Sequence, residues 1–443
     1  MKNIILYINL IIVTIIGFSS CSKQNATQDR TAAEIINNPS YTAMSFGGYR
    51  HLTRDTVPSV TDLKEDVRIL SAMGIKLIRL YDTQLGQTPN LLQAISELKQ
   101  EDKSLELYVM LGAWIEAENS RTDSVNHHKE NIIGNTAEIE KAVEYTNKYP
   151  DIVKCISVGN EAMVHWAASY NVTQDVILKW VKYLQALKQE DKLPKDVWIT
   201  SSDNFASWGG GDGSYHTDLL LELYKSVDFI SVHTYPFHDT FYNPSYWYVP
   251  EEEANLDAIV QIDRAMERAV AYTKMQYMSV VNYMHSIGIN KPVVIGETGW
   301  ASLDGAYSPS ADASADISIN IQKIINKEQT MYGLNGSKAA DEYKEKLYYD
   351  RLREWTAKDS ITCFYFEIFD EPWKDAKHPS GTENHFGLID INGHAKYALW
   401  NLVDDGTFKG LKRNGKAISK SFNGNRESLM KTVLPPPLIT TKE

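Results

Sequence analysis

The chain has 443 residues and a formal net charge of −12, with 43% hydrophobic and 23% charged residues. These proportions are ordinary for a globular protein, and the length suits two or three average domains or one large α/β barrel. The negative balance argues against nucleic acid as a partner, because such binding requires clustered Lys and Arg. The 25 Tyr, 12 Phe and 10 Trp mostly serve a core, but they also suit a cleft for sugars, whose flat faces stack on rings.

The amino-terminal segment has the pattern of an export signal. Lys2 precedes an apolar stretch, and small residues lead to Cys21; the stretch is too short for a membrane span. Small residues before a cysteine resemble the lipobox of bacterial lipoproteins, which implies cleavage before Cys21 and acylation of its thiol. Phe18 stands where leucine is usual, so plain secretion remains the alternative. We expect a signal peptide over 1–20, a polar tether over 21–38, and a lipid anchor in the outer membrane of a Gram-negative-type cell, on either face.

Eight short apolar runs recur along the chain, each followed by a polar loop and a segment with helical periodicity. Their apolar character is continuous, as in parallel strands covered on both faces. The runs span 41–50, 75–82, 105–116, 153–161, 196–203, 227–236, 291–300 and 360–371. Strands alternating with helices in this number predict an α/β fold, a single (β/α)₈ TIM barrel over 39–405. An open doubly wound sheet is the competitor, but no strand–turn–helix carries a Gly-rich phosphate fingerprint.

The segments around the strands complete this organisation. Asn135 and Glu138 have the spacing of a capping box and predict a helix that begins there. Residues 406–443 are basic and polar and end in a proline-rich stretch. We interpret them as a short appendage and a solvated tail, with attraction to an anionic envelope surface as the alternative. Cys155 and Cys363 lie inside apolar runs, which predicts buried free thiols rather than a disulfide framework.

Every apolar run ends in a polar residue. Catalytic groups of such barrels lie on the rim where the strands end. Acidic residues also cap the helices that follow strands, but capping does not explain why so many polar strand ends converge on one rim. The residues at these ends are Asp82, Glu116, Glu161, Asp203, Tyr235, Glu297, Asp370 and Glu371.

Glu161 and Glu297 end the fourth and seventh runs, so their side chains can face each other across the barrel mouth. Two carboxyl groups are the minimum for hydrolysing a glycosidic bond: one protonates the leaving oxygen and the other, ionised, attacks the anomeric carbon. We expect a raised pKa for Glu161 once Glu297 is ionised, because like charges resist joint ionisation. This mechanism needs no cofactor and no metal, and the eleven His show no metal-ligand spacing.

Four motifs resemble those of glycoside hydrolase family 17. They occur in order and are IRLYD (78–82), SVGNE (157–161), IGETGW (295–300) and YFEIFDEPWK (365–374). The resemblance implies that Glu161 is the acid/base, that Glu297 is the nucleophile, and that the substrates are β-1,3-glucans of the laminarin type, cleaved with retention. A transglycosylase with the same glutamates is the alternative, and a non-catalytic glucan-binding lipoprotein is a weaker one. We expect a monomer.

Three further polar residues are assigned to the cleft. Asn160 can hydrogen-bond the sugar 2-hydroxyl, a contact that strengthens in the transition state. Tyr235 can donate to the carboxylate of Glu297 and keep it ionised. Tyr81 is expected to face the cleft from the end of its strand.

Aromatic and charged residues near the seventh and eighth strands supply the remaining candidates. Trp300 and Trp373 are candidate stacking platforms, with core packing as the alternative for either. Glu371 and Lys374 match family positions that bind substrate or orient the nucleophile, with a simple rim salt bridge as the alternative. The aromatic-rich loop 238–257 is longer than expected for compact relatives. We expect this loop to wall the cleft, which leaves the choice between endo- and exo-action open.

Overall fold

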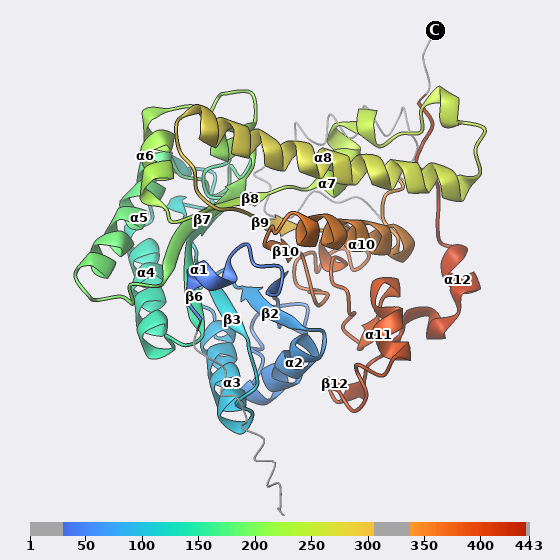
Figure 1. Cartoon of the computed structure of the whole chain (residues 1–443), viewed down its shortest axis with the longest axis horizontal. Coiled ribbons are helices and arrows are strands. Elements are labelled where there is room, and N and C mark those ends of the chain that lie inside the picture. Colours follow the sequence, from blue (N-terminus) through green and yellow to red (C-terminus); the bar gives the residue numbers. More distant parts are fainter. Residues whose placement is uncertain (1–29, 305–336, 440–443) are drawn as a thin grey trace, which may run out of the picture.

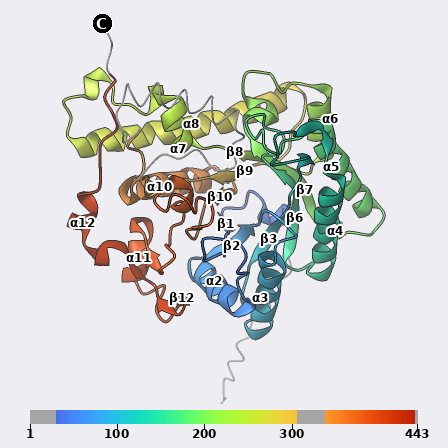
Figure 2. The same cartoon turned by 180° about the vertical axis from the view of Figure 1, so that it is seen from behind.

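The structure is a computed structural model that describes residues 30–304 and 337–439. Parallel strands close into a barrel (Figures 1 and 2) in the order β1-β10-β9-β8-β7-β6-β3-β2. The strands are β1 (Thr42–Ser45), β2 (Ile75–Arg79), β3 (Tyr108–Ala113), β6 (Val153–Asn160), β7 (Trp198–Asn204), β8 (Ile230–His233), β9 (Val293–Thr298) and β10 (Cys363–Tyr365). Each coincides with one of the eight predicted runs, with β7 ending one residue beyond its run, so the predicted TIM barrel is confirmed.

Helices surround the barrel and cover its strands (Figure 1). They are α2 (Val60–Ala72), α3 (Gln87–Glu101), α4 (Ile132–Lys148), α5 (Gln174–Gln189), α6 (Asp218–Ser226), α7 (Pro236–Tyr242), α8 (Ala258–Ser286), α10 (Glu342–Lys358), α11 (Trp400–Asp404) and α12 (Arg426–Met430). Helix α5 illustrates why the helices pack on the barrel. Its residues Ile177, Val181 and Leu184 lie on one face and are fully buried. Each such side chain contributes about 1.5–3 kcal/mol relative to exposure.

A short amino-terminal helix, α1 (Ala32–Ile35), closes the amino end of the barrel. Its Ala32 and Ile35 are fully buried against the first layer of strand side chains, which includes Leu77 of β2 and Phe364 of β10. The prediction of a polar tether over 21–38 is therefore wrong for its described part, because α1 belongs to the core. The signal segment and Cys21 lie outside the described residues.

The segment after residue 405 is folded against the barrel rather than a solvated tail. Its hairpin of β12 (Lys412–Arg413) and β13 (Lys416–Ala417) inserts Arg413, fully buried, beside Asp66 of α2. Further along, the backbone N–H of Ile439 donates to the carbonyl of Val249 at 2.9 Å. The chain thus runs past α12 to the loop before α8, beside the amino-terminal end of that helix, as Figure 1 shows in red. Long-range ionic contacts, which a sequence pattern does not reveal, hold this segment.

Helix α4 ties two strand ends together. It begins at Ile132 with Asn131 as its N-cap, so the capping box predicted from Asn135 and Glu138 is wrong. Glu138 instead accepts hydrogen bonds from the backbone N–H groups of Thr83, at 2.8 Å, and Trp114, at 3.2 Å. Burial raises the pKa of Glu138 to about 7. The carboxyl group therefore fixes the loops after β2 and β3, which form part of the rim.

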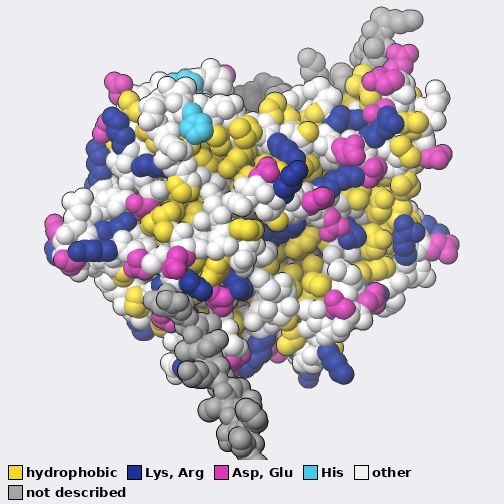
Figure 3. Space-filling view, in the orientation of Figure 1, with side chains coloured by type: hydrophobic (Ala, Val, Ile, Leu, Met, Phe, Trp, Pro, Cys, Tyr) yellow, Lys and Arg dark blue, Asp and Glu magenta, His cyan; other side chains and the backbone are white. Residues whose placement is uncertain are grey.

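The structure also bears on the predictions for the cysteines and for the surface charge. Cys155 and Cys363 are buried free thiols, as expected. On the face drawn in Figure 3, basic and acidic side chains are interspersed, and the described part of this face has no continuous basic area. Within 30–304 and 337–439, no helix is long and apolar enough to cross a membrane.

Candidate active site

Glu161 and Glu297 lie on the carboxyl rim of the barrel and share one imidazole. Glu161 follows β6 with a left-handed backbone, φ 48°, and its N–H donates to the carbonyl of Ser202 at 3.0 Å. Nδ1 of His233 lies 3.0 Å from Oε1 of Glu161 and 3.9 Å from Oε2 of Glu297, so these two oxygens are closer than about 7 Å. At this distance the two carboxyl groups can act on opposite sides of one glycosidic bond.

Both oxygens of Glu297 accept hydrogen bonds. Arg79 donates to Oε2 at 2.7 Å, and the Tyr235 hydroxyl donates to Oε1 at 2.6 Å, the contact expected from the sequence. Burial alone would raise the pKa of Glu297, but His233, Arg79, the Tyr235 hydrogen bond and Lys374 outweigh burial and hold it below its ordinary value. Glu297 is therefore ionised at neutral pH, as a nucleophile requires.

Glu161, in contrast to Glu297, favours its protonated form. Burial, with a smaller contribution from the charge of Glu297, raises the pKa of Glu161 to about 8. Arg79 and His238 partly oppose this shift. At neutral pH Glu161 is thus protonated next to an ionised carboxylate, which is the arrangement that general acid catalysis needs.

His233 orients the carboxyl group of Glu161. Burial lowers the pKa of His233 to about 4, so the imidazole is neutral. Its Nε2 faces the Arg79 guanidinium at 3.1 Å and the Ser202 hydroxyl at 2.7 Å. A guanidinium only donates, so Nε2 carries the lone pair and Nδ1 the hydrogen. Nδ1–H then donates to Oε1 of Glu161, which leaves the acidic proton to Oε2.

Asn160 and Tyr81 both contact Arg79. Oδ1 of Asn160 accepts from Arg79 at 2.6 Å, so the amide group turns its two N–H donors away from the guanidinium. The Arg79 guanidinium lies over the half-buried ring of Tyr81, 4.6 Å from its centroid. The structure therefore gathers both predicted residues around the guanidinium that holds Glu297.

Glu371, Trp373 and Lys374 form a second cluster after β10. Nζ of Lys374 lies 3.2 Å from Glu371 and 3.0 Å from the fully buried Glu367. Trp373 donates its indole N–H to Glu371 at 2.9 Å. Glu371 fits there because Gly47 has no side chain: a Cβ on Gly47 would lie 2.0 Å from the carboxyl carbon. Both carboxyl groups that Lys374 contacts are buried, unlike those of the simple rim salt bridge considered as the alternative, whereas Lys374 and Trp373 are half-buried.

Trp300 does not face the cleft, so its interpretation as a stacking platform is wrong in this structure. The side chain is fully buried and donates its indole N–H to the carbonyl of Ala339 at 2.8 Å. Trp247, from the loop predicted to wall the cleft, packs on Trp300 at 5.4 Å and is also fully buried. Trp247 and Tyr248 of this loop are thus part of the core. By contrast, the Trp373 ring remains half-buried at the rim, with Arg54 4.1 Å above it.

Sequence reasoning missed Arg79 and His233 as site residues. An arginine inside the apolar run of β2 is a signal, because a buried guanidinium demands an acidic partner. His233 is the last residue of β8, and a titratable side chain at the end of a barrel strand is a signal of the same kind. His238 and Glu383 also act on Glu161 through their charges, but no local pattern marks them. Within the described residues, no group of three or more His, Cys, Asp or Glu could hold a metal ion.

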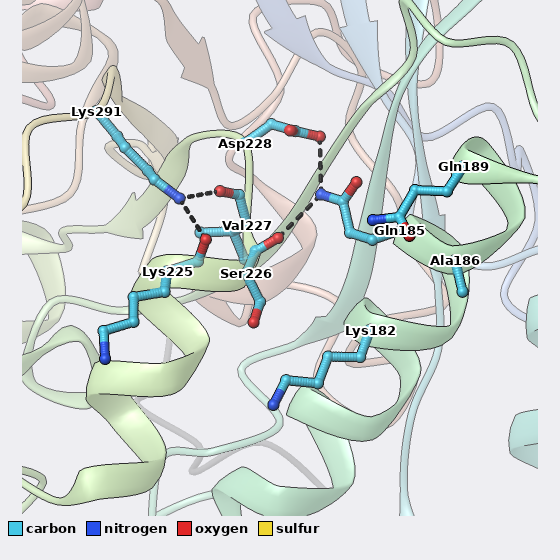
Figure 4. Close-up of a pocket in the computed structure, with 9 residues that line it drawn as sticks. All are labelled: Lys182, Gln185, Ala186, Gln189, Lys225, Ser226, Val227, Asp228 and Lys291. Atoms are coloured by element: carbon cyan, nitrogen blue, oxygen red, sulfur yellow. Dashed lines mark hydrogen bonds between the residues drawn. The ribbon is translucent and has the colours of Figure 1, made fainter.

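A surface cavity of about 440 Å³ lies at the opposite end of the barrel, where β8 and β9 begin (Figure 4). Its lining comes from α5, α6 and the segments before the two strands. Lys291 points across it and donates to the backbone carbonyl of Lys225 at 2.9 Å. The lysines there are engaged with backbone and acidic groups, so the cavity offers no chemistry comparable to that of the rim.

Comparisons with known proteins agree with this geometry. The BtgE/BtgC glycoside hydrolase domain model matches residues 43–387. The crystal structure of an endo-laminarinase from Formosa Hel1_33_131 is 51% identical, with a TM-score of 0.85, over 94% of this chain and 99% of that one. A putative glucan endo-1,3-β-glucosidase, btgC of Aspergillus niger, is 24% identical over 75% of this chain and 39% of its own length. The chain spans less than half of the Aspergillus relatives it matches.

A more distant structure shares the fold alone. The glycoside hydrolase family 17 β-1,3-glucanosyltransferase of Rhizomucor miehei is 17% identical, with a TM-score of 0.52, over 81% of this chain and 96% of that one. At this identity the similarity extends to the barrel and not to the reaction.

Proposed function

Because the chain belongs to the BtgE/BtgC glycoside hydrolase domain family, we propose that it hydrolyses internal bonds of laminarin-type β-1,3-glucan with retention of configuration. The similarity to an endo-laminarinase over nearly the whole chain supports this substrate. The observation that carries the chemistry is the opposite protonation of two neighbouring carboxyl groups. Glu161 keeps its proton at neutral pH, whereas Glu297 is ionised.

In the first step Glu297 attacks the anomeric carbon of the sugar bound above it. The bond from that carbon to the next sugar breaks, and Glu161 gives its proton to the departing oxygen. The products are a glucosyl ester on Glu297 and a shortened chain with a new hydroxyl group. Arg79 and Tyr235 hold the nucleophile in place before the attack, so little reorganisation is needed.

The second step uses Glu161 as a base. Burial is the main cause of the raised pKa of Glu161, and the charge of Glu297 adds to it. Esterification removes that charge, so the pKa of Glu161 falls and its ionised form becomes easier to hold. His233 Nδ1–H, 3.0 Å from Oε1, stabilises the new carboxylate. Water attacks the anomeric carbon, gives a proton to Glu161, and the ester bond to Glu297 breaks with overall retention.

Membership of glycoside hydrolase family 17 is the finer part of this proposal. The four sequence motifs support it, and the shared fold of the Rhizomucor enzyme agrees with it. A transglycosylase would use the same two steps with a sugar hydroxyl in place of water, so only its products differ.

A digest of linear β-1,3-glucan by the mature chain, beside Glu297→Ala, tests the proposal. Products are sized over time and their anomeric form is read early by NMR. We expect a ladder of short β-anomeric oligosaccharides from the wild type and none from the variant. Early α-anomers, or release of one small product from the start, would contradict retaining endo-hydrolysis. Products longer than the substrate would favour the transglycosylase.

The proposal also includes export and a lipid anchor on Cys21. It rests on the apolar stretch and the small residues before this cysteine. In a Gram-negative host fed labelled palmitate, the wild type should carry label and sediment with outer membranes, whereas Cys21→Ser should remain unlabelled. An unlabelled, soluble wild type would contradict the anchor.

A further inference from the structure

Trp166 is an exposed tryptophan five positions after the acid/base residue Glu161. It lies in the loop 161–173 that leaves β6 after Glu161, and 53% of its surface is exposed. Its neighbours Val164 and Ala167 are buried, so the indole stands out from a packed loop. A single exposed aromatic side chain is not unusual on a protein surface, but at the rim that carries the acid/base residue an exposed indole offers a flat apolar face to a sugar.

The loop around Trp166 is fixed rather than loose. The backbone N–H of Met163 donates to the carboxyl group of Asp203, on β7, at 2.7 Å. The next anchor is Tyr215, whose hydroxyl accepts from the N–H of His165 at 2.8 Å while its ring stacks on the His165 ring at 4.5 Å. An exposed ring on such a support loses little entropy when it binds a ligand.

The reaction places the leaving sugar on the side of Glu161. Glu161 must lie within hydrogen-bond reach of the departing oxygen to protonate it, so the sugar attached to that oxygen extends toward the loops beside β6. These are the loop 161–173 itself and the loops after its barrel neighbours β3 and β7. Trp114, after β3, packs on Tyr170 of the same loop at 5.0 Å. The surface on this side is therefore aromatic.

We propose that Trp166 stacks on a glucosyl unit on the leaving-group side of the scissile bond. This inference rests on the proposed function and deepens it, because it assigns a residue to sugars that leave the site first. The flat apolar face of a glucose ring matches an indole, while its hydroxyls remain in water. The same surface would hold an acceptor sugar, so its removal should reduce any transglycosylation.

Two substrates that differ in their leaving group test the assignment. Laminarihexaose places sugars on the leaving side, whereas β-laminaribiosyl fluoride releases only fluoride. We expect Trp166→Ala to lower kcat/KM for laminarihexaose by about tenfold, which is a loss of about 1.4 kcal/mol of transition-state stabilisation. The value for the fluoride should stay unchanged, and Trp166→Phe should restore most of the loss.

Tyr183→Ala is the matched control, because Tyr183 is 43% exposed on α5 and outside the rim. It should leave both substrates unchanged. An equal loss on both substrates in Trp166→Ala, or none on laminarihexaose, overturns the stacking role. A wild type that turns over neither substrate overturns the proposed function itself, and the role of Trp166 with it.

Discussion

Glu161 is buried beside an ionised neighbour, and this fixes how activity depends on pH. Burial raises its pKa to about 8, so the general acid loses its proton above that pH and kcat/KM should fall. On the acid side, kcat/KM should fall only below the ordinary pKa of 4.5, because the pKa of Glu297 lies below that value. Initial rates on laminarihexaose from pH 3 to 10 measure the acidic and basic limbs of this pH–rate profile. A basic limb that begins below pH 6 would contradict the assignment of Glu161 as the general acid.

Tyr235→Phe tests the acidic limb of the pH–rate profile separately. It removes the hydrogen bond of 2.6 Å that favours ionised Glu297, so the acidic limb should move to higher pH while the basic limb stays in place. Tyr183→Phe, on the outer face of α5, should shift neither limb.

The raised pKa of Glu161 is also a stability cost at alkaline pH. Between its unfolded value near 4.5 and its folded value of about 8, the folded state holds a proton that the unfolded chain has lost, so stability falls as pH rises. Glu161→Gln cannot lose a proton and should melt at a higher temperature than the wild type at pH 8. Thermal unfolding monitored by fluorescence checks this. The difference in melting temperature between the variant and the wild type should vanish toward pH 4.5. A difference that stays constant with pH would point to a cause other than the titration of Glu161.

The ends of the apolar runs predict some of the active-site residues, but not all of them. Glu297 and Tyr235 are predicted from their place where two apolar runs end. Arg79 stands in β2, far along the chain from the carboxylate it binds, so barrel closure alone brings the two together. Trp300 follows Glu297 by three residues, but its direction is set by Trp247 and Ala339, which no local pattern links to it.

At the scale of elements, the contact between α2 and β12 joins distant parts of the chain through buried charge. Asp66 is fully buried and pairs with Arg50 at 2.8 Å and with Arg413 at 3.3 Å. Asp66→Ala would leave two guanidinium groups without their carboxylate, which should cost about 3–5 kcal/mol of unfolding free energy. Chemical denaturation measures the loss.

Lys64→Ala is the control on the same helix. Lys64 pairs with Glu97 and Glu101 at the surface, where such pairs contribute about 0–1 kcal/mol. If both variants lost equally little, the segment after residue 405 would not be held by its ionic contact with α2.

The same contact shows why the sequence predicts the barrel strands better than the segments at the two ends of the chain. Continuous apolar runs are local signals, and each of the eight contains a barrel strand. The segments 30–38 and 406–439 look polar and basic, yet they pack through single buried residues such as Ile35 and Arg413. Glu138 likewise has the spacing of a cap but serves the ends of β2 and β3. Such roles depend on which elements become neighbours after folding.

The whole molecule has two functionally distinct ends. Helix α1 packs on the amino-end layer of the barrel, and Asn37 accepts from the N–H of Thr362, just before β10. Glu161 and Glu297 lie on the opposite, carboxyl rim. The first described residues therefore lead out on the side away from the catalytic rim. With the anchor on Cys21 proposed above, we expect the rim to face away from the membrane.

This orientation predicts that anchoring leaves catalysis intact. Acylated protein reconstituted in phospholipid vesicles should hydrolyse laminarihexaose with the kcat/KM of the soluble Cys21→Ser form, within about twofold, a difference of about 0.4 kcal/mol. Long linear β-1,3-glucan should behave in the same way, because the lipid surface does not block the rim. The rates of both forms on both substrates, normalised to accessible enzyme, provide the measurement. A loss confined to the long glucan would mean that the membrane covers part of the cleft. The anchor would then approach the rim, contrary to the position of α1 at the amino end of the barrel.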